Sequence, residues 1–316
     1  MRASVIVPAR DARMTLPETL AGLGEQTLGG RFEVIVVDNG SRDDTAKLAE
    51  RSEIVARVIR RPRGDGPGAA RNAGAAASRG EVLAFLDADC RPAPEWLASG
   101  VAAVGDHDLV QGKVLPDPDA TLGPFDRTLA VTGAHGLFES ANLFVTRELF
   151  DHVGGFPAGL EAGGRGEAAP FGEDVLFGWR ARRAGARTGF DERALAYHEV
   201  FARGPEGFLA ERARVAMFPA LAAQVPELRT SFFYRRLFLS RRSASFDLGV
   251  VGVALALLSR RPLSLIAAAP YAWLLANDTR RWGRRAPALA PVELLADAVG
   301  AAALIRGSVA SGSPVL

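Results

Sequence analysis

The chain is poor in three things: cysteine, lysine and net charge. Cys90 is the single cysteine among 316 residues, and Lys47 and Lys113 are the only lysines. One thiol excludes an internal disulfide framework and fits a reducing compartment, where we expect Cys90 to be structural. A formal net charge of +2 gives no global basic field, so we expect no nucleic-acid partner.

Long apolar runs are also missing near the N-terminus. The first apolar run is too short for the core of a signal peptide, and Arg10, Asp11 and Arg13 interrupt it at once. We therefore interpret this segment as the first strand of a cytosolic domain. The remaining composition, 48% hydrophobic and 23% charged, is ordinary for a folded protein, and the length predicts two domains or one domain with an appendage.

Short segments rich in strand-forming residues alternate with helical segments through the first hundred residues. The expected strands are 3–7, 32–37, 54–59 and 82–86, and the expected helices are 15–26, 41–51, 69–78 and one that starts near Pro94. This alternation predicts a doubly wound, mostly parallel α/β sheet. Later expected elements are strands at 110–114 and 140–145, a mobile glycine-rich loop over the site at 159–170, and a helix that opens near Glu173.

Two carboxylates follow the most apolar of these strands, in Asp87-Ala88-Asp89. Ligands of open α/β sheets collect outside the carboxyl ends of the strands. Mg²⁺ and Mn²⁺ prefer oxygen ligands and often bind one or two carboxylates together with substrate phosphates. The pair is therefore a candidate metal and phosphate anchor, and the alternative is a solvated turn in which an Asp caps the next helix.

Two further features could hold a nucleotide. Asp38 and Asn39 end the second strand, where they could bond a base or a ribose. The loop 66–72 places backbone N–H groups and Arg71 at a helix N-terminus, which favours a phosphate. Its glycine spacing matches neither a dinucleotide fingerprint nor a P-loop, and a plain turn with a helix cap is the alternative.

The helix that opens at Gly172 carries two acids in its first turn, Glu173 and Asp174. Acids there complement the helix dipole, and that is the structural explanation. The functional alternative makes Asp174 a general base in the cleft, with Glu173 capping or orienting. His198 ends a short strand candidate; alone it is more often structural than a ligand.

The last third of the chain changes in composition. Three strongly apolar segments, 248–258, 263–276 and 288–305, are each shorter than the ~20 residues that a spanning helix needs. Arginine pairs flank them on both sides. Three interpretations stay open: an interfacial anchor, a short transmembrane hairpin with both flanks cytoplasmic, and a soluble helical subdomain, with membrane attachment favoured. The expected domains are 1–225, made of a nucleotide-binding half (1–105) and an acceptor-side half (106–225), and a helical region, 226–316.

Six motifs in one order resemble the family 2 glycosyltransferases, which have the GT-A fold. The motifs are Val5-Ile6-Val7-Pro8-Ala9-Arg10, the segment 36–45 around Asp38, the segment 68–74 around Arg71, Phe85-Leu86-Asp87-Ala88-Asp89, Asn142 with Val153-Gly154-Gly155-Phe156, and Gly172-Glu173-Asp174. The resemblance covers Ser4 to about His198. It implies an inverting transfer of a sugar from a nucleotide-sugar donor to an acceptor hydroxyl, with a divalent metal, Mg²⁺ or Mn²⁺.

The resemblance also implies a role for each site residue. Asp89 and His198 would ligate the metal, with Asp87 beside them and nearer the ribose, and Asp174 would deprotonate the acceptor with Glu173 next to it. The nucleotide-binding residues it implies are Pro8, Ala9, Arg10, Asp11, Asp38, Asn39, Arg71, Asp87 and Ala88. The residues implied for the donor sugar or acceptor are Asn142, Gly172 and Trp179.

Departures from the family pattern leave the substrates open. Asn39 stands where many members have a second Asp, and Ala9-Arg10-Asp11 stands where a Tyr-Asn pair is frequent, so the base could be that of UDP, GDP or dTDP. No Gln-x-x-Arg-Trp follows Asp174, which argues against a processive synthase. The apolar C-terminal region suggests a glycan or lipid-linked acceptor and a catalytic domain at the cytoplasmic face of a membrane.

Two other classes compete with this hypothesis. One is a catalytically silent nucleotide-sugar-binding or scaffold subunit of a membrane glycan assembly, which the intact set of Asp87, Asp89, Asp174 and His198 disfavours. The other is a nucleotidyltransferase, which would carry a glycine-rich signature with Arg and Lys directly after the first strand. The sequence Pro8-Ala9-Arg10-Asp11 lacks that signature.

Overall fold

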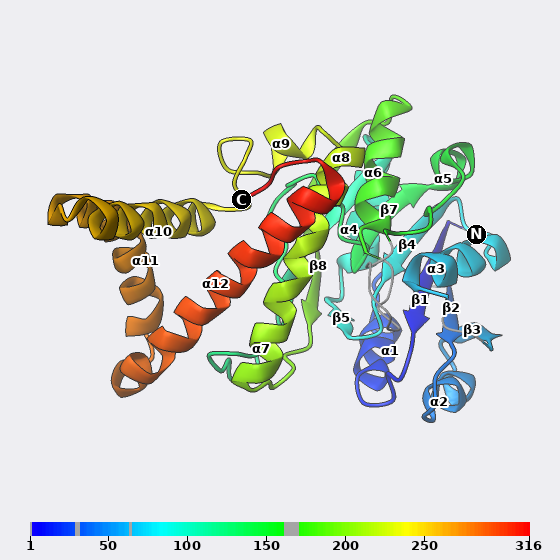
Figure 1. The fold of residues 1–316 in the computed structure, drawn as a ribbon. Coiled ribbons are helices and arrows are strands. Elements are labelled where there is room, and N and C mark those ends of the chain that lie inside the picture. Colours follow the sequence, from blue (N-terminus) through cyan, green and yellow to red (C-terminus); the bar gives the residue numbers. More distant parts are fainter. Residues whose placement is uncertain (1, 29–31, 63–64, 161–170) are drawn as a thin grey trace. The chain divides into compact units, whose positions relative to one another are not determined.

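The computed structural model describes residues 2–28, 32–62, 65–160 and 171–316, and it divides the chain into two compact units (Figure 1). Unit 1 comprises Met1–Thr121 and Thr128–Val200, and unit 2 comprises Leu122–Arg127 and Phe201–Leu316. The division after Val200 differs from the boundary expected after residue 225. Most of the glycine-rich loop expected at 159–170, residues 161–170, lies outside the described residues.

Unit 1 is built on a sheet of eight strands in the order β3-β2-β1-β4-β7-β6-β8-β5. Their bounds are β1 Ala3–Ala9, β2 Phe32–Asn39, β3 Val55–Arg61, β4 Val82–Leu86, β5 Cys90–Pro92, β6 Leu109–Pro116, β7 Asn142–Thr146 and β8 Thr188–His198. β1 pairs in parallel with β2 and β4, and β6 pairs in parallel with β8. β7 runs antiparallel between β4 and β6. The expected doubly wound, mostly parallel α/β sheet is confirmed.

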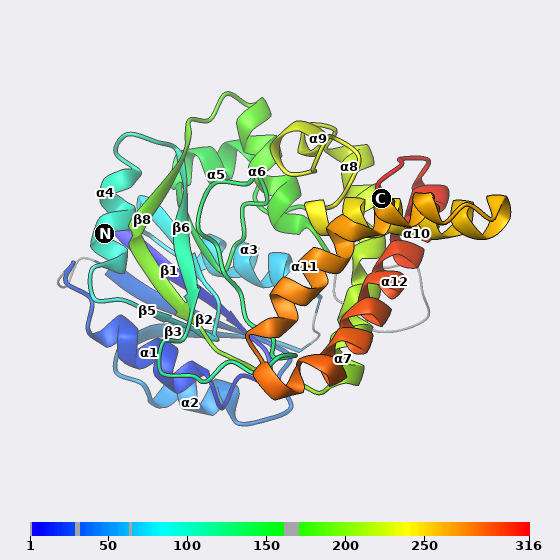
Figure 2. The same cartoon turned by 90° about the vertical axis from the view of Figure 1, so that its left-hand side faces the viewer.

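Helices cover both faces of this sheet (Figure 2). They are α1 Leu16–Gly24, α2 Thr45–Arg51, α3 Pro67–Ala77, α4 Trp96–Ala103, α5 Arg147–Val153 and α6 Glu173–Arg183. Side chains alternate between the faces of a strand. Val5 and Val7 of β1 therefore join the core with residues of α1, α2 and α4, while Phe85 of β4 contacts Phe150 and Phe156 on the opposite side.

The far end of β8 brings two distant parts of the chain together. β8 is longer than the short strand expected near residue 198, and its last residues pair antiparallel with β5. In this register His198 lies opposite Cys90. Asp89, which precedes β5, is thereby brought beside the histidine.

Unit 2 consists of helices α7 Pro205–Arg212, η1 Ala213–Met217, α8 Phe218–Gln224, α9 Leu228–Ser231, α10 Arg241–Ser259, η2 Pro262–Ala268, α11 Ala269–Arg280, η3 Gly283–Arg285 and α12 Ala286–Ser311. α12 packs against α7, η1 and α8. The contact is close, because a Cβ atom on Gly307 would lie 2.1 Å from the Ala216 carbonyl oxygen. This packing explains why 201–225 belongs with the C-terminal helices rather than with the sheet.

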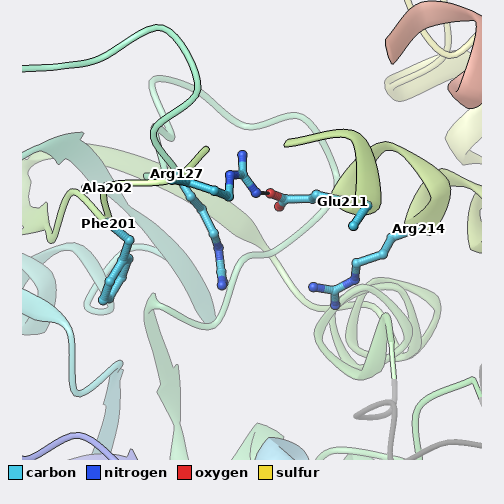
Figure 3. Close-up of a pocket in the computed structure, with 7 residues that line it drawn as sticks. Arg127, Phe201, Ala202, Glu211 and Arg214 are labelled. Carbon is cyan, nitrogen blue, oxygen red and sulfur yellow. Dashed lines mark hydrogen bonds and ion pairs between the residues drawn. The ribbon is translucent and has the colours of Figure 1, made fainter. Parts of the chain in front are cut away.

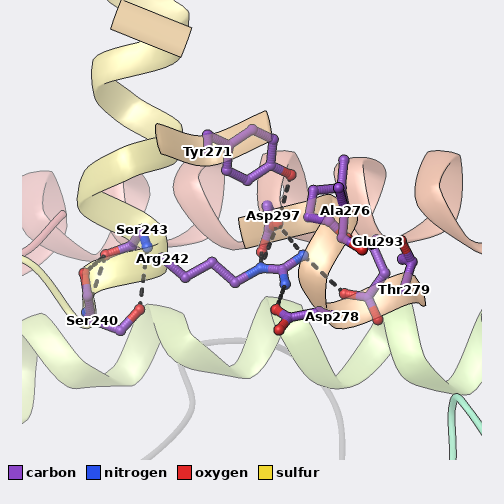
Figure 4. Close-up of polar contacts among 10 residues, drawn as sticks. Ser240, Arg242, Ser243, Tyr271, Ala276, Asp278, Thr279, Glu293 and Asp297 are labelled. Carbon is purple, nitrogen blue, oxygen red and sulfur yellow. Dashed lines mark hydrogen bonds and ion pairs between the residues drawn. The ribbon is translucent and has the colours of Figure 1, made fainter. Parts of the chain in front are cut away.

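One arginine joins the three long helical segments of unit 2 (Figure 4). The Arg242 guanidinium, on α10, donates to Asp297 on α12 at 2.8 and 3.0 Å, and to Asp278 on α11 at 2.7 Å. It also donates to Glu293 at 3.0 Å, and the Tyr271 hydroxyl donates to Asp297 at 2.7 Å. Breaking such a network by removing one partner leaves uncompensated charges, so it fixes the mutual packing of α10, α11 and α12.

Outside this network the C-terminal helices are apolar and exposed. Two of them, Arg241–Ser259 and Gly283–Ser311, are long and apolar enough to cross a bilayer by length and composition, with mean hydropathies of 1.4 and 1.8. Only 17% and 22% of the residues in the 18-residue apolar stretches of these two helices are buried. The helices are longer than the apolar segments from which they were predicted, because polar residues extend both ends.

Candidate functional site

The site forms in unit 1 where β1, β2 and β4 end on the same edge of the sheet. The loop after β1 is fixed to the loop after β2. The Asp11 backbone N–H donates to Ser41 Oγ at 3.0 Å, and the Arg42 N–H donates to Asp11 Oδ1 at 2.7 Å. Asp11 has a φ of 50°, an uncommon conformation that Asp tolerates better than most residues. Pro8 and Ala9 lie at the end of β1 next to Val37 and Asp38, and the side chain of Arg10 is exposed.

Asp38 and Asn39 end β2 with 7% and 5% of their surface exposed. Asp38 Oδ1 accepts the Ser41 backbone N–H at 3.2 Å, which shapes the turn. Asn39 Nδ2 donates to the Gly66 carbonyl at 3.1 Å, directly before α3. Among the residues described, Asn39 Oδ1 has no hydrogen-bond partner although it is buried. An unpaired buried acceptor is uncommon, and it marks this end of β2 as a place where a ligand donor would be satisfied.

Arg71, on α3, is the centre of the site. It is 3% exposed, and its guanidinium donates to Asp87 Oδ1 at 2.6 Å and to Glu173 Oε1 at 3.2 Å. Its guanidinium carbon lies 5.6 Å from the centroid of the Phe156 ring. Burial lowers the pKa of Arg71, but the charges of Asp87 and Glu173 outweigh burial and raise it overall. Arg71 is therefore a permanent cation that connects the end of β4 to the start of α6.

Asp174 is the most perturbed acid at the site. Burial, followed by the charge of Glu173, raises the pKa of Asp174 from 3.8 to about 7, while Arg71 and the Val175 N–H oppose the shift. Asp174 Oδ1 accepts that N–H at 2.8 Å, and Oδ2 accepts the Ser140 N–H at 3.5 Å. A strongly shifted acid at the end of a sheet is a candidate for proton transfer.

The two acids of α6 thus have different environments, which favour different charge states. Glu173 is occupied by Arg71, whereas Asp174 sits in a setting that disfavours its charge. Gly172 precedes them as the N-cap with a φ of 77°, in the left-handed region that glycine adopts without a steric penalty. It positions both acids through the backbone.

Asp89 and His198 form a second group of possible ligands. The Asp89 carboxylate, the Cys90 thiol and the His198 imidazole have donor atoms within 4.8 Å of one another. His198 Nδ1 lies 2.7 Å from the Glu199 carbonyl oxygen, which can only accept, so Nδ1 carries a proton. Nε2 then faces Asp89 Oδ2 at 3.6 Å. A carbonyl that orients the far ring nitrogen is typical of histidines that bind metals.

The donor set of this group fits a divalent cation such as Mn²⁺, which takes carboxylate and imidazole ligands. Cys90 is fully buried, and burial together with the charges of Asp89 and Asp87 raises the pKa of its thiol well above the ordinary value. A neutral thiol is a poor ligand for a hard cation. This agrees with the prediction that Cys90 is structural.

Three predicted site residues have structural contacts instead. Asn142 is fully buried, with Oδ1 accepting from Trp96 Nε1 at 2.8 Å and Nδ2 donating to the carbonyls of Lys113 and Ala194. Trp179 is 6% exposed, and its Nε1 donates to the Gly136 carbonyl at 2.8 Å. Gly172 is buried and contributes backbone geometry. The polar atoms of Asn142 and Trp179 are bonded inside the fold, and contact of these residues with the donor sugar or acceptor stays a prediction.

Sequence reasoning missed Glu139 and Thr128. Burial raises the pKa of Glu139, and its charge contributes to the raised pKa of Asp174. The Thr128 hydroxyl lies 3.5 Å from His198 Nδ1. Both residues lie in the segment between β6 and β7, which has no regular periodicity. The one feature that could have pointed to Glu139 is its position directly before the expected strand at 140–145.

A doubly wound sheet with acids and one buried arginine at the ends of β1, β2 and β4 defines a GT-A-type transferase fold. Comparisons with known proteins identify the family. Residues 4–160 match the family model described as "Glycosyl transferase family 2". These residues belong to this family.

Individual relatives agree with the assignment. "Glycosyltransferase AglE" of Haloferax volcanii is 31% identical over 209 residues, 62% of this chain and 66% of AglE. An "Undecaprenyl-phosphate 4-deoxy-4-formamido-L-arabinose transferase" of Pseudomonas savastanoi pv. phaseolicola is 37% identical over 114 residues, 34% of either chain. The chain thus matches less than two thirds of the length of these relatives. Among solved structures, "Mannosyltransferase PcManGT from Pyrobaculum calidifontis in complex with GDP-Man and Mn2+" shares the fold, with a TM-score of 0.56, 21% identity, and coverage of 98% of this chain and 86% of that one.

The raised pKa of Asp174 makes a prediction about stability. Because the folded pKa of about 7 lies above the ordinary 3.8, the folded chain retains a proton that the unfolded chain releases between these values. The free energy of unfolding therefore falls as pH rises from about 4 to about 7. Between pH 5 and pH 8 we expect the free energy of unfolding to fall by about 2–3 kcal/mol less in Asp174→Asn than in the wild type. Urea unfolding at each pH measures this difference.

Asp151→Asn, at an exposed position of α5, is the matched control for the loss of one carboxylate. It should follow the wild-type pH dependence. If Asp174→Asn also follows the wild-type curve, the carboxyl of Asp174 is ionised in the folded chain at pH 5, and the assigned environment is wrong.

Proposed function

We propose that the chain is an inverting, metal-dependent glycosyltransferase, which moves a sugar from a nucleotide-sugar donor to a hydroxyl of a glycan or lipid-linked acceptor. The observation that carries the proposal is that unit 1 holds two different kinds of group: an acid with a raised pKa, and a set of possible metal ligands. Asp174 has a carboxyl with a pKa of about 7, suited to proton abstraction near neutral pH. Asp89 and His198 form a donor set suited to a cation. One group serves the acceptor and the other serves the donor.

The donor end is supported by charge and by fold. The sheet edge holds Asp38 and Asn39 at the end of β2 and Arg71 in the second turn of α3, in the arrangement that suits a nucleoside and its phosphates. A divalent cation held by Asp89 and His198, with Asp87 beside them, would neutralise charge on the donor diphosphate as it leaves. The named complex of PcManGT with GDP-Man and Mn2+ makes a nucleotide sugar and a metal a consistent pair for this fold.

The acceptor end depends on Asp174. Its carboxyl is half-buried, and a neighbouring Glu173 already bonded to Arg71 cannot take its place without breaking that ion pair. Asp174 would accept the hydroxyl proton as the new glycosidic bond forms. The acceptor oxygen would attack the anomeric carbon as its bond to the diphosphate breaks. A base on one side and a separate cation that stabilises the leaving diphosphate fit this single displacement, which inverts the anomeric carbon.

Attachment to a membrane is the second part of the proposal. Leu257 and Leu258 of α10 are 76% and 84% exposed, Leu263 and Ile266 of η2 are 75% and 65% exposed, and Trp273 of α11 is 67% exposed. Contiguous apolar surface of this kind marks a membrane or protein interface. Arginines at 260–261, 280–281 and 284–285 suit anionic headgroups. The relative named for an undecaprenyl-phosphate substrate supports a lipid-linked acceptor and a catalytic unit on the cytoplasmic face.

The donor site is tested by calorimetry with UDP, GDP and dTDP, with and without Mn²⁺, on detergent-purified protein. We expect one nucleotide to bind in a metal-dependent way and Asp89→Ala to weaken its binding at least tenfold. Asp119→Ala is the control, because the Asp119 side chain is 88% exposed. If no nucleotide binds to folded wild-type protein, the catalytically silent scaffold is the better hypothesis.

The base is tested by turnover once the donor is known. We expect Asp174→Asn to lower kcat by about 10²–10⁴-fold while the donor binds with unchanged affinity. The wild-type rate should rise with pH and level off above about pH 7, because Asp174 must lose its proton to act. A variant with near wild-type turnover would assign the base to another residue.

The membrane surface is tested by flotation with vesicles that contain anionic phospholipid. We expect the double variant Leu257→Glu, Leu258→Glu to lose most of its vesicle binding, because both side chains are exposed on α10. Met14→Glu, at a position 77% exposed in unit 1, is the control. Equal flotation of the double variant and the wild type would exclude α10 as the attachment surface.

A further inference from the structure

Unit 2 contains a cavity of about 410 Å³ that plays no part in the site described above (Figure 3). Its polar lining is three guanidinium groups, from Arg127, Arg203 and Arg214, and the carboxylate of Glu211. Three positive charges against one negative charge leave the cavity with an excess of two positive charges. The volume is more than ten times the ~30 Å³ that one water molecule occupies in the liquid, so a polyatomic anion fits.

One of the arginines is already used by the protein. Arg203 forms an ion pair with Glu211 and donates from Nε to the Phe125 carbonyl at 2.9 Å. Its guanidinium also lies 5.8 Å from the centroid of the Phe208 ring. These contacts fix Arg203 and Glu211 in the wall of the cavity. Their charges offset each other, so the excess positive charge belongs to the other two arginines.

Arg127 and Arg214 come from separate segments and extend toward the same space (Figure 3). Within the described ranges neither guanidinium has a hydrogen bond or an ion pair. The backbone behind Arg127 is rigid, because its N–H and carbonyl both bond to Phe201 at 2.9 Å. Arg214 lies on η1, which packs against α12. Both cations are therefore presented by fixed backbone.

The chemistry of arginine limits the classes of ligand that this cavity could bind. A guanidinium cannot lose its proton in proteins, so both groups keep their positive charge and favour an anion. Its planar fork of N–H donors matches the oxygens of phosphate, and the match is stronger than that of lysine. The backbone behind both arginines is fixed before binding, so capture of the ligand has to order only the two side chains.

We propose that this cavity is a binding site for a phosphate group, held between Arg127 and Arg214. Two sources share this chemistry: the phosphate head of a lipid, which the apolar helices of the same unit would bring to the cavity, and a soluble phosphate. The site is made of unit 2 residues alone. It does not depend on the donor site or on the proposed transfer reaction.

The test uses the full chain in detergent with EDTA present, so that metal-dependent binding at the donor site does not contribute. Calorimetric titrations compare inorganic phosphate with geranyl phosphate, a short prenyl phosphate. We expect binding that weakens about three- to tenfold in Arg127→Gln and in Arg214→Gln, and at least tenfold in the double variant. Arg51→Gln, at an exposed position on α2 of unit 1, should match the wild type, and circular dichroism verifies that each variant is folded.

The outcomes separate the sources and decide the proposal. Binding of geranyl phosphate at least tenfold tighter than that of inorganic phosphate identifies a lipid phosphate, and equal affinities identify a soluble phosphate. Unchanged binding to the double variant, or no binding to the folded wild type, overturns the site. Nucleotide binding with Mn²⁺, measured on the same samples, reports separately on the proposed donor site, so either hypothesis can fail alone.

Discussion

The buried guanidinium of Arg71 is the constraint on which the site depends. It joins α3, the end of β4 and the start of α6 through two carboxylates. Removing it would leave Asp87 and Glu173 as unbalanced charges beside Asp174, a change that costs several kcal/mol in buried networks. Arg71 also opposes the upward pKa shift of Asp174. The same cation therefore sets the geometry of the acids and keeps the candidate base within reach of ionisation at neutral pH.

The sequence predicted the strands that are buried on both faces, because they are continuous apolar runs. β4 has the expected bounds, and β1 and β2 start where expected and extend two residues further. It underestimated β8, where Asp191, Glu192 and Arg193 interrupt the apolar pattern near a shift in register with β6. The site followed the same logic. Asp87 and Asp89 stood out at a strand end, whereas Glu139 lies in an irregular segment whose path only long-range packing defines.

Polar residues near a site are harder to assign, because a buried amide and a substrate-binding amide look alike in sequence. Asn142 bonds three strands or helices from within the core. The extent of each domain is hard to predict for a related reason. The segment 201–225 has the composition of any amphipathic helix. It belongs to unit 2 because it contacts α12, nearly a hundred residues later in the chain.

Unit 2 combines a charged cluster between its helices with apolar side chains on its surface. Arg242 and its three acids join α10, α11 and α12, while large apolar side chains face outward together with arginines at the helix ends. Such an arrangement suits a low-dielectric surrounding, in which polar groups must be satisfied within the protein.

Cys90 gives the protein a built-in chemical reporter. As the single cysteine, fully buried at the first residue of β5 and held neutral by its surroundings, it is unreactive toward thiol reagents while β5 and β8 stay paired. Modification can occur only when that pair opens. The rate at which this thiol is modified therefore measures the separation of β5 from β8, next to Asp89 and His198, without a label being introduced.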